Sequence, residues 1–217
     1  EEKLLYKEAD MSEAIEQILD IAKIITYEQD SRQPFFNEGA ADMIAGAALF
    51  LMELGIDEYV NFKSIKYLMS LGGEASDEKG KRTLLQDYLE AQREVDAASR
   101  AKLDTFFEST GNTRSSLKAT FVNKISLLTA TPAIERMTST TTFDFKDVFN
   151  KKTAIFLITH DEKTTYYPLV SMFFKQLYEV GIKASRENPM RRLKIPMNWV
   201  IDEMAQLAEI RDVEAIY

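Results

Sequence analysis

Residues 197–207 read MNWVIDEMAQL, a short apolar run that ends in two adjacent carboxylates, Asp202 and Glu203, and then turns polar. A short apolar run bounded by a proline and by charged residues is typical of a buried strand. A strand holds the residues at its exit rigidly, and a carboxylate misplaced by about 1 Å can cost about 100-fold in rate. The stretch therefore predicts a strand over residues 197–201 with both acids at its carboxyl end.

A second apolar stretch, residues 153–159 (TAIFLIT), is rich in β-forming residues and apolar on both faces, as a central parallel strand should be. A helix is expected between the two strands, at about 165–181, followed by a basic loop over 185–196. Strand, helix and strand form a βαβ unit, which crosses over right-handed. Ligands of open α/β sheets bind at the carboxyl ends of strands, so this edge is the expected site.

Two acids at a strand exit fit the acidic pair of a P-loop ATPase, where one acid organises Mg²⁺ and another orients the attacking water. In this interpretation Asp202 is the cofactor-binding residue and holds Mg²⁺ through water, and Glu203 is the catalytic residue. The alternative is a solvated strand exit, or a helix start whose acids complement the helix dipole.

The required partner is a Gly-x-x-x-x-Gly-Lys-[Ser/Thr] loop that holds the phosphates. The nearest match is GKRT at residues 80–83. It has Arg82 where the motif needs Ser or Thr, Ala75 where the first Gly belongs, and no strand before it. We reject this match, so the acidic pair is half of a site.

Three further candidates each have a plainer interpretation. His160 follows the first strand and could act as a base, but a single loop histidine is the simpler view. Four basic residues between 186 and 194 could contact a nucleotide or nucleic acid, or simply be a solvated loop. Arg114 lies near a helix start that could bind phosphate, whereas an ordinary cap with an exposed arginine is the alternative.

The composition is that of a globular protein, with 45% hydrophobic residues among 217. The formal net charge of −8 argues against a main nucleic-acid surface, which needs clustered Lys and Arg, and suits an interface with a basic partner. The absence of Cys and the single His exclude disulfides, thiolate metal sites and multi-His zinc centres. No signal peptide is visible at residue 1, and the apolar run 43–54 is too short to span a bilayer.

Roughly the first 140 residues have helical periodicity and predict a bundle. Asp10 and Glu13 fit a capping box at the start of the first helix. The second helix, about 35–54, is apolar nearly all round and should lie at the centre, with Gly55 just after its end. A third helix is expected over 62–71 after Asn61, and others near 83–91, 98–109 and 113–130. Residues 138–142 are expected to be an extended connector.

The order of these elements resembles the coupling proteins of type IV secretion systems, the conjugative DNA-transfer ATPases of the TraG/TraD family. The resemblance is specific over residues 155–212, where the helix motif LVSMFFKQL at 169–177 precedes the strand and its Asp-Glu pair. It is looser upstream, where QPFFNEGAA at 33–41 resembles the opening of the family's all-α domain. Met204 stands where many relatives have Phe, a difference that affects packing rather than metal chemistry.

The resemblance implies an α-helical bundle domain followed by part of a RecA-like α/β P-loop ATPase domain. The all-α domain is expected over 1–142, as an inserted domain that recognises cargo, and the partial nucleotide-binding domain over 143–217. ATP and Mg²⁺ are the expected cofactors of the whole protein. The phosphate-binding loop, a membrane anchor and a trans-acting arginine segment are expected outside these residues. The piece is therefore not expected to bind nucleotide tightly or to hydrolyse ATP alone.

The implied function is to recruit a relaxosome DNA–protein substrate and drive it into a conjugation channel. The implied partners are relaxase or relaxosome accessory proteins and channel components, with DNA handled by a hexamer at the cytoplasmic face of the inner membrane. Two alternatives stay open. One is a protein-binding helical adaptor with no ATPase role, and the other is a DNA-pumping ATPase of the chromosome-segregation kind.

Overall fold

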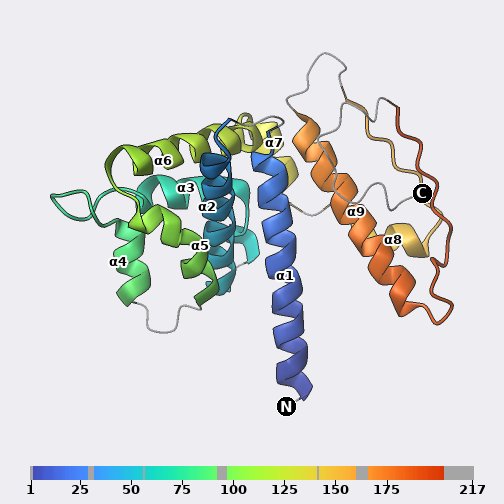
Figure 1. Cartoon of the computed structure of the whole chain (residues 1–217). Coiled ribbons are helices and arrows are strands. Elements are labelled where there is room, and N and C mark those ends of the chain that lie inside the picture. Colours follow the sequence, from blue (N-terminus) through green and yellow to red (C-terminus); the bar gives the residue numbers. More distant parts are fainter. Residues whose placement is uncertain are drawn as a thin grey trace. The chain divides into compact units, whose positions relative to one another are not determined.

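The structure, a computed structural model, describes residues 2–28, 32–55, 57–91, 97–140, 142–159 and 166–202. The chain divides into two compact units, a helical unit, Glu1–Ser139, and a C-terminal unit, Thr140–Tyr217 (Figure 1). The charge divides with them. The helical unit has 24 Asp and Glu against 16 Lys and Arg, whereas the C-terminal unit has 11 of each. The entire net charge of −8 therefore belongs to the helical unit.

The described part of the helical unit is built from helices and short 3₁₀ turns. Its elements are α1 (Glu2–Thr26), α2 (Pro34–Glu53), η1 (Asp57–Tyr59), α3 (Phe62–Gly72), α4 (Leu84–Ala91), α5 (Ala97–Glu108), α6 (Gly111–Ser126), η2 (Leu127–Thr129) and α7 (Pro132–Ser139). Helices of 16 residues or more, such as α1, α2 and α6, need an apolar face to pack on, and here they share one core. The prediction of a helical bundle is confirmed.

Helix α2 is the centre of the bundle and packs against α1, α3, α5 and α6 (Figure 1). Its residues from Gly39 to Leu51 are buried with the exception of Asp42, which is half-buried. Small residues let α5 approach closely: a Cβ added at Gly46 would lie 2.6 Å from Leu103 Cγ. The prediction that this helix, apolar on nearly all sides, lies at the centre of the bundle is confirmed.

Helix ends follow local rules in two of three predicted cases. Asn61 caps α3, its side chain accepting a hydrogen bond from the Ser64 N–H at 2.9 Å. Gly55 follows α2 with φ of +70°, a conformation that glycine adopts at no steric cost. The third prediction is wrong, because α1 begins at Glu2 and places Asp10 inside the helix instead of at its cap. The preceding run of Lys, Leu and Glu favours helix strongly enough to extend it.

The C-terminal unit contains α8 (Phe145–Asn150) and α9 (Tyr167–Glu187), which pack together. A Cβ added at Gly181 of α9 would lie 2.9 Å from Phe149 Cζ of α8, so the glycine permits this close approach. Helix α9 agrees with the helix predicted over 165–181. Helix α8 was not predicted, and α7 extends to Ser139 into the expected connector.

The two predicted strands do not form a sheet in the described part of the chain. Residues 153–159 and 197–201 are neither helical nor paired with another segment there. Phe156 and Ile158 are 83% and 93% exposed, and Val200 is 96% exposed. A central parallel strand needs a hydrogen-bonded neighbour and a covered face on each side. The described residues supply neither, so the βαβ unit is not observed.

Among the described residues, one helix has the length and apolar composition that a membrane span requires, and that helix is α2. Two thirds of its most apolar window is buried inside the helical unit. The core helix of a globular bundle meets the same two criteria. Its position therefore explains its composition without a membrane.

Candidate functional site

Asp202 is the predicted site residue that the structure describes. Its side chain is exposed and it directly follows the apolar stretch at 197–201. Glu203, the predicted catalytic residue, lies outside the described residues, and so do His160 and Asp161. The expected meeting of the two acidic strand exits therefore stays a prediction.

The segment that leads to Asp202 has the burial pattern of an extended chain. Every second residue is half-buried and each residue between them is exposed. The half-buried positions are Leu193, Ile195, Met197, Trp199 and Ile201. A period of two is that of a β-strand with one covered face. The segment thus has one face against its own unit and the other open, without the pairing that the predicted strand requires.

Five aromatic rings lie in sequence along this unit and end at that segment. Phe143 and Phe145 meet edge to face with centroids 5.3 Å apart, and both contact Phe173 of α9, at 6.3 and 5.2 Å. Phe173 contacts its neighbour Phe174 at 6.4 Å. Phe174 contacts Trp199 at 5.3 Å. We call these five residues the aromatic series. The separations are those of favourable aromatic pairs.

Asp202 fits one kind of magnesium site. Mg²⁺ in phosphoryl-transfer enzymes is held by one or two carboxylates together with waters and substrate phosphates, instead of by a cage of protein ligands. The described residues contain no cluster of three or more His, Cys, Asp or Glu that could hold a metal by itself. The exposed carboxylate of Asp202 suits a magnesium ion that arrives with a nucleotide.

The basic residues between 186 and 194 lie on the surface after α9. Arg186, Arg191, Arg192 and Lys194 are all exposed. The turn is fixed locally, because the Arg191 N–H donates to the Asn188 carbonyl at 2.8 Å and the Met190 N–H donates to Asn188 Oδ1 at 3.0 Å. Contact of these residues with a nucleotide or nucleic acid stays a prediction.

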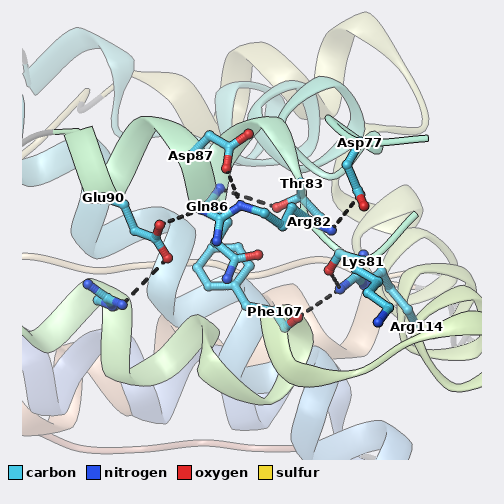
Figure 2. A network of polar contacts seen from close by, with 10 residues as sticks. Asp77, Lys81, Arg82, Thr83, Gln86, Asp87, Glu90, Phe107 and Arg114 are labelled. Carbon is cyan, nitrogen blue, oxygen red and sulfur yellow. Dashed lines mark hydrogen bonds and ion pairs between the residues drawn. The ribbon is translucent and has the colours of Figure 1, made fainter. Parts of the chain in front are cut away.

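In the helical unit, Arg114 has a structural role that neither sequence interpretation anticipated. It is 8% exposed, and its guanidinium donates to the backbone carbonyls of Lys81 at 2.6 Å and Phe107 at 2.7 Å (Figure 2). It also donates to the Gly80 carbonyl at 2.8 Å. The guanidinium also lies 5.9 Å from the centroid of the Phe106 ring. Burial lowers the pKa of Arg114 from its ordinary value. A guanidinium occupied in this way is neither a phosphate ligand nor an exposed cap.

The loop that Arg114 anchors connects α3 to α4 and is closed by its own backbone. The Ser76 N–H donates to the Arg82 carbonyl and the Leu84 N–H to the Glu74 carbonyl, each at 3.0 Å. Asp77 accepts from the Arg82 N–H at 2.8 Å, which lowers the pKa of the Asp77 carboxyl. The anchor of this loop is therefore polar.

Arg82 occupies the position that the rejected phosphate-loop match would give to Ser or Thr. Its side chain forms ion pairs with Asp87, at 2.6 Å, and with Glu90, both on α4 (Figure 2). The Glu90 and Asp87 hydrogen bonds raise the pKa of the Arg82 guanidinium. This stretch is therefore used to join the loop to α4.

The chain was compared with known proteins in three ways. A family model described as type IV secretory system conjugative DNA transfer matches residues 3–217. Neither the curated proteins nor the solved structures gave a match. The family model covers both units, including the stretch around Asp202.

Proposed function

The chain belongs to the type IV secretory system conjugative DNA transfer family, and on this premise we propose that it forms part of the ATP-driven coupling protein of such a system. That protein recruits a relaxosome DNA–protein substrate and drives it into the secretion channel at the cytoplasmic face of the inner membrane. The match over residues 3–217 carries the proposal, because it covers the helical unit and the acidic stretch together. It also favours conjugative transfer over chromosome segregation.

The nucleotide-binding role falls to the C-terminal unit. Asp202 is exposed at the end of a segment whose burial has a period of two, and this position suits the strand exit of the proposal. Asp202 would hold Mg²⁺ through water, and the ion when bound would neutralise charge on the phosphates. Glu203 would orient the attacking water and accept its proton. The loop that binds the phosphates is a different part of the ATPase from these 217 residues.

The cargo-binding role falls to the helical unit. Its net charge of −8 is carried on a helical bundle in which Arg114 and the Arg82–Asp87 ion pair fix the loop between α3 and α4. An acidic surface repels DNA phosphates and attracts basic protein segments. Relaxase or relaxosome accessory proteins are therefore the proposed partners of this unit, and DNA is handled by the assembled hexamer.

The test is a pair of substitutions in the full-length protein. Glu203→Gln should lower ATP turnover by about 100-fold or more, because a positioned general base contributes about 10²–10⁴. ATP binding should persist, measured by equilibrium titration with a fluorescent nucleotide. Glu187→Gln, which removes an exposed carboxylate at the end of α9, is the matched control and should leave turnover unchanged. Unchanged turnover and DNA transfer in Glu203→Gln would contradict the role of Glu203.

A helical adaptor without ATPase function is the second candidate, and the concentration of the net charge in the helical unit favours it specifically. The same experiment separates the two. If Glu203→Gln leaves transfer intact while the chain still captures relaxase, the adaptor is correct. If transfer and turnover fail together while relaxase binding persists, the coupling ATPase is correct.

A further inference from the structure

The aromatic series joins the start of the C-terminal unit to the segment that carries Asp202. Phe143 lies four positions after Ser139, where the helical unit ends. Trp199 lies three positions before Asp202, the candidate magnesium residue. Between these ends the rings of Phe145, Phe173 and Phe174 complete the contacts. The series therefore runs from the connector that leaves the helical unit to the segment that carries the candidate site.

We propose that the aromatic series positions Asp202 and transmits movement of the connector to it. The inference rests on the proposed function in one respect, namely that Asp202 is a nucleotide-site residue. The residues of the aromatic series are positioning residues, because they act through the segment and do not contact the reacting atoms. The partner of the helical unit would then influence ATP turnover through the connector and these rings.

The geometry suits such a role. Three of the five contacts have interplanar angles between 72° and 86°, in which the edge of one ring meets the face of another. The Phe143–Phe173 and Phe174–Trp199 contacts are tilted at 51° and 42°. Such contacts depend on orientation as well as distance, so a rotation of one ring changes the preferred position of the next. Phe173 and Phe174 are adjacent on α9, which passes a movement of one ring rigidly to the other.

The open face of the Asp202 segment gives the series its importance. Val200 is 96% exposed while Trp199 is half-buried, so the Trp199 side is the covered side of this segment. A carboxylate displaced by about 1 Å can lose about 100-fold in rate. The Phe174 ring, which contacts Trp199 at 5.3 Å, therefore helps to position the segment that carries Asp202.

A neighbouring phenylalanine serves as the control. Phe149 lies on α8 with Phe145, is 3% exposed, and packs against Gly181. Phe149 is more buried than Phe145. It packs against Gly181 of α9, whereas Phe145 contacts α9 through the aromatic series. Replacing Phe149 removes as much ring as replacing Phe145 does, without removing a member of the series. A purely structural effect would be at least as large at Phe149.

Trp199 is the one tryptophan of the chain and reports on its own position. In the 217-residue chain, Phe145→Leu should raise the acrylamide quenching constant of tryptophan fluorescence by about 2-fold or more, although Phe145 reaches Trp199 through Phe173 and Phe174. Phe145→Tyr keeps the ring and should restore the constant, and Phe149→Leu should leave it unchanged. Equal quenching in Phe145→Leu and the unaltered chain would overturn transmission along the series.

The functional arm uses the full-length protein. Phe145→Leu should lower kcat for ATP by about 2- to 10-fold, the range expected from losing the Phe145–Phe173 pair that connects to Trp199, with KM unchanged. Phe145→Tyr should recover it and Phe149→Leu should not reproduce the loss. If Asp202→Asn leaves turnover unchanged, the proposed function fails whatever the rings do. If Asp202→Asn abolishes turnover but Phe145→Leu equals Phe149→Leu, the inference fails and the proposed function stands.

Discussion

The two units of this chain use apolar residues in opposite ways. In the helical unit, the most apolar segment is α2, and its residues are buried on all sides by α1, α3, α5 and α6. In the C-terminal unit, the most apolar segments are residues 153–159 and 197–201, and Phe156, Ile158 and Val200 are almost fully exposed. Hydrophobicity alone therefore does not decide burial.

The difference shows which kind of segment can satisfy its backbone hydrogen bonds without a neighbouring segment. A helix satisfies its backbone hydrogen bonds internally and needs only side-chain contacts to be buried. A strand needs hydrogen-bonding neighbours as well, and the described residues provide none for these two segments. The described helices of the helical unit satisfy their backbone hydrogen bonds internally, whereas the C-terminal unit has an open strand-like face beside Asp202.

The largest effect should separate the two units directly. Phe121 is 0% exposed in the helical unit, and Phe121→Ala should lower the free energy of unfolding by about 3–5 kcal/mol. Phe156 is 83% exposed, and Phe156→Ala should change it by less than about 0.5 kcal/mol. Urea unfolding followed by circular dichroism measures both. A comparable loss in Phe156→Ala would show that residues 153–159 are packed in solution, and it would contradict the difference in burial between the two units.

A smaller effect should sharpen the account of the helical unit. Arg114→Met should lower the free energy of unfolding by about 1–3 kcal/mol, because it removes the donor from three backbone carbonyls. Amide hydrogen exchange should also become faster over residues 76–82. The control is Arg100→Met, which removes an exposed arginine with a 3.8 Å ion pair to Glu90. Equal effects of the two substitutions would remove the special role given to Arg114.

The smallest effect concerns pH. The Arg82 N–H lowers the pKa of Asp77 below its ordinary value near 3.8. A depressed pKa in the folded state gives stability that is present above the ordinary value and is lost as pH falls through the folded value. The urea concentration at the unfolding midpoint should therefore decrease as the pH is lowered from about 5 to about 2, and this decrease should be less steep in Asp77→Ala. Glu78→Ala removes the adjacent charge and should keep the original slope. An unchanged slope in Asp77→Ala would assign the acid sensitivity to other carboxylates.

Local patterns predicted the elements of the helical unit well. Asn61 at the start of α3, Gly55 after α2 and the apolar run of α2 all have the roles expected of them. Each depends on residues within a few positions, which a sequence displays directly. The capping box at Asp10 failed because α1 starts earlier, and α8 is too short at six residues to show a period.

The candidate site was predictable only as a pattern. The Asp202–Glu203 pair was recognisable from the apolar run before it, and its role stays a prediction because Glu203 lies outside the described residues. The aromatic series had no sequence signal, because Phe145, Phe173 and Trp199 are separated by 26 to 54 positions and share no motif. Which aromatic residues meet is decided by how α8, α9 and the last segment fold together.

A helical bundle around α2, an acidic first unit, and an acidic pair whose context indicates the conjugative transfer family all follow from the amino-acid sequence. These are consequences of helical period, composition and local motifs. Only the tertiary structure decided that Arg114 holds a loop 33 and 34 positions away, and that Trp199 is linked to Phe143 by the aromatic series. A side chain finds its partner through the packing of whole helices, and that distance in sequence leaves no local trace.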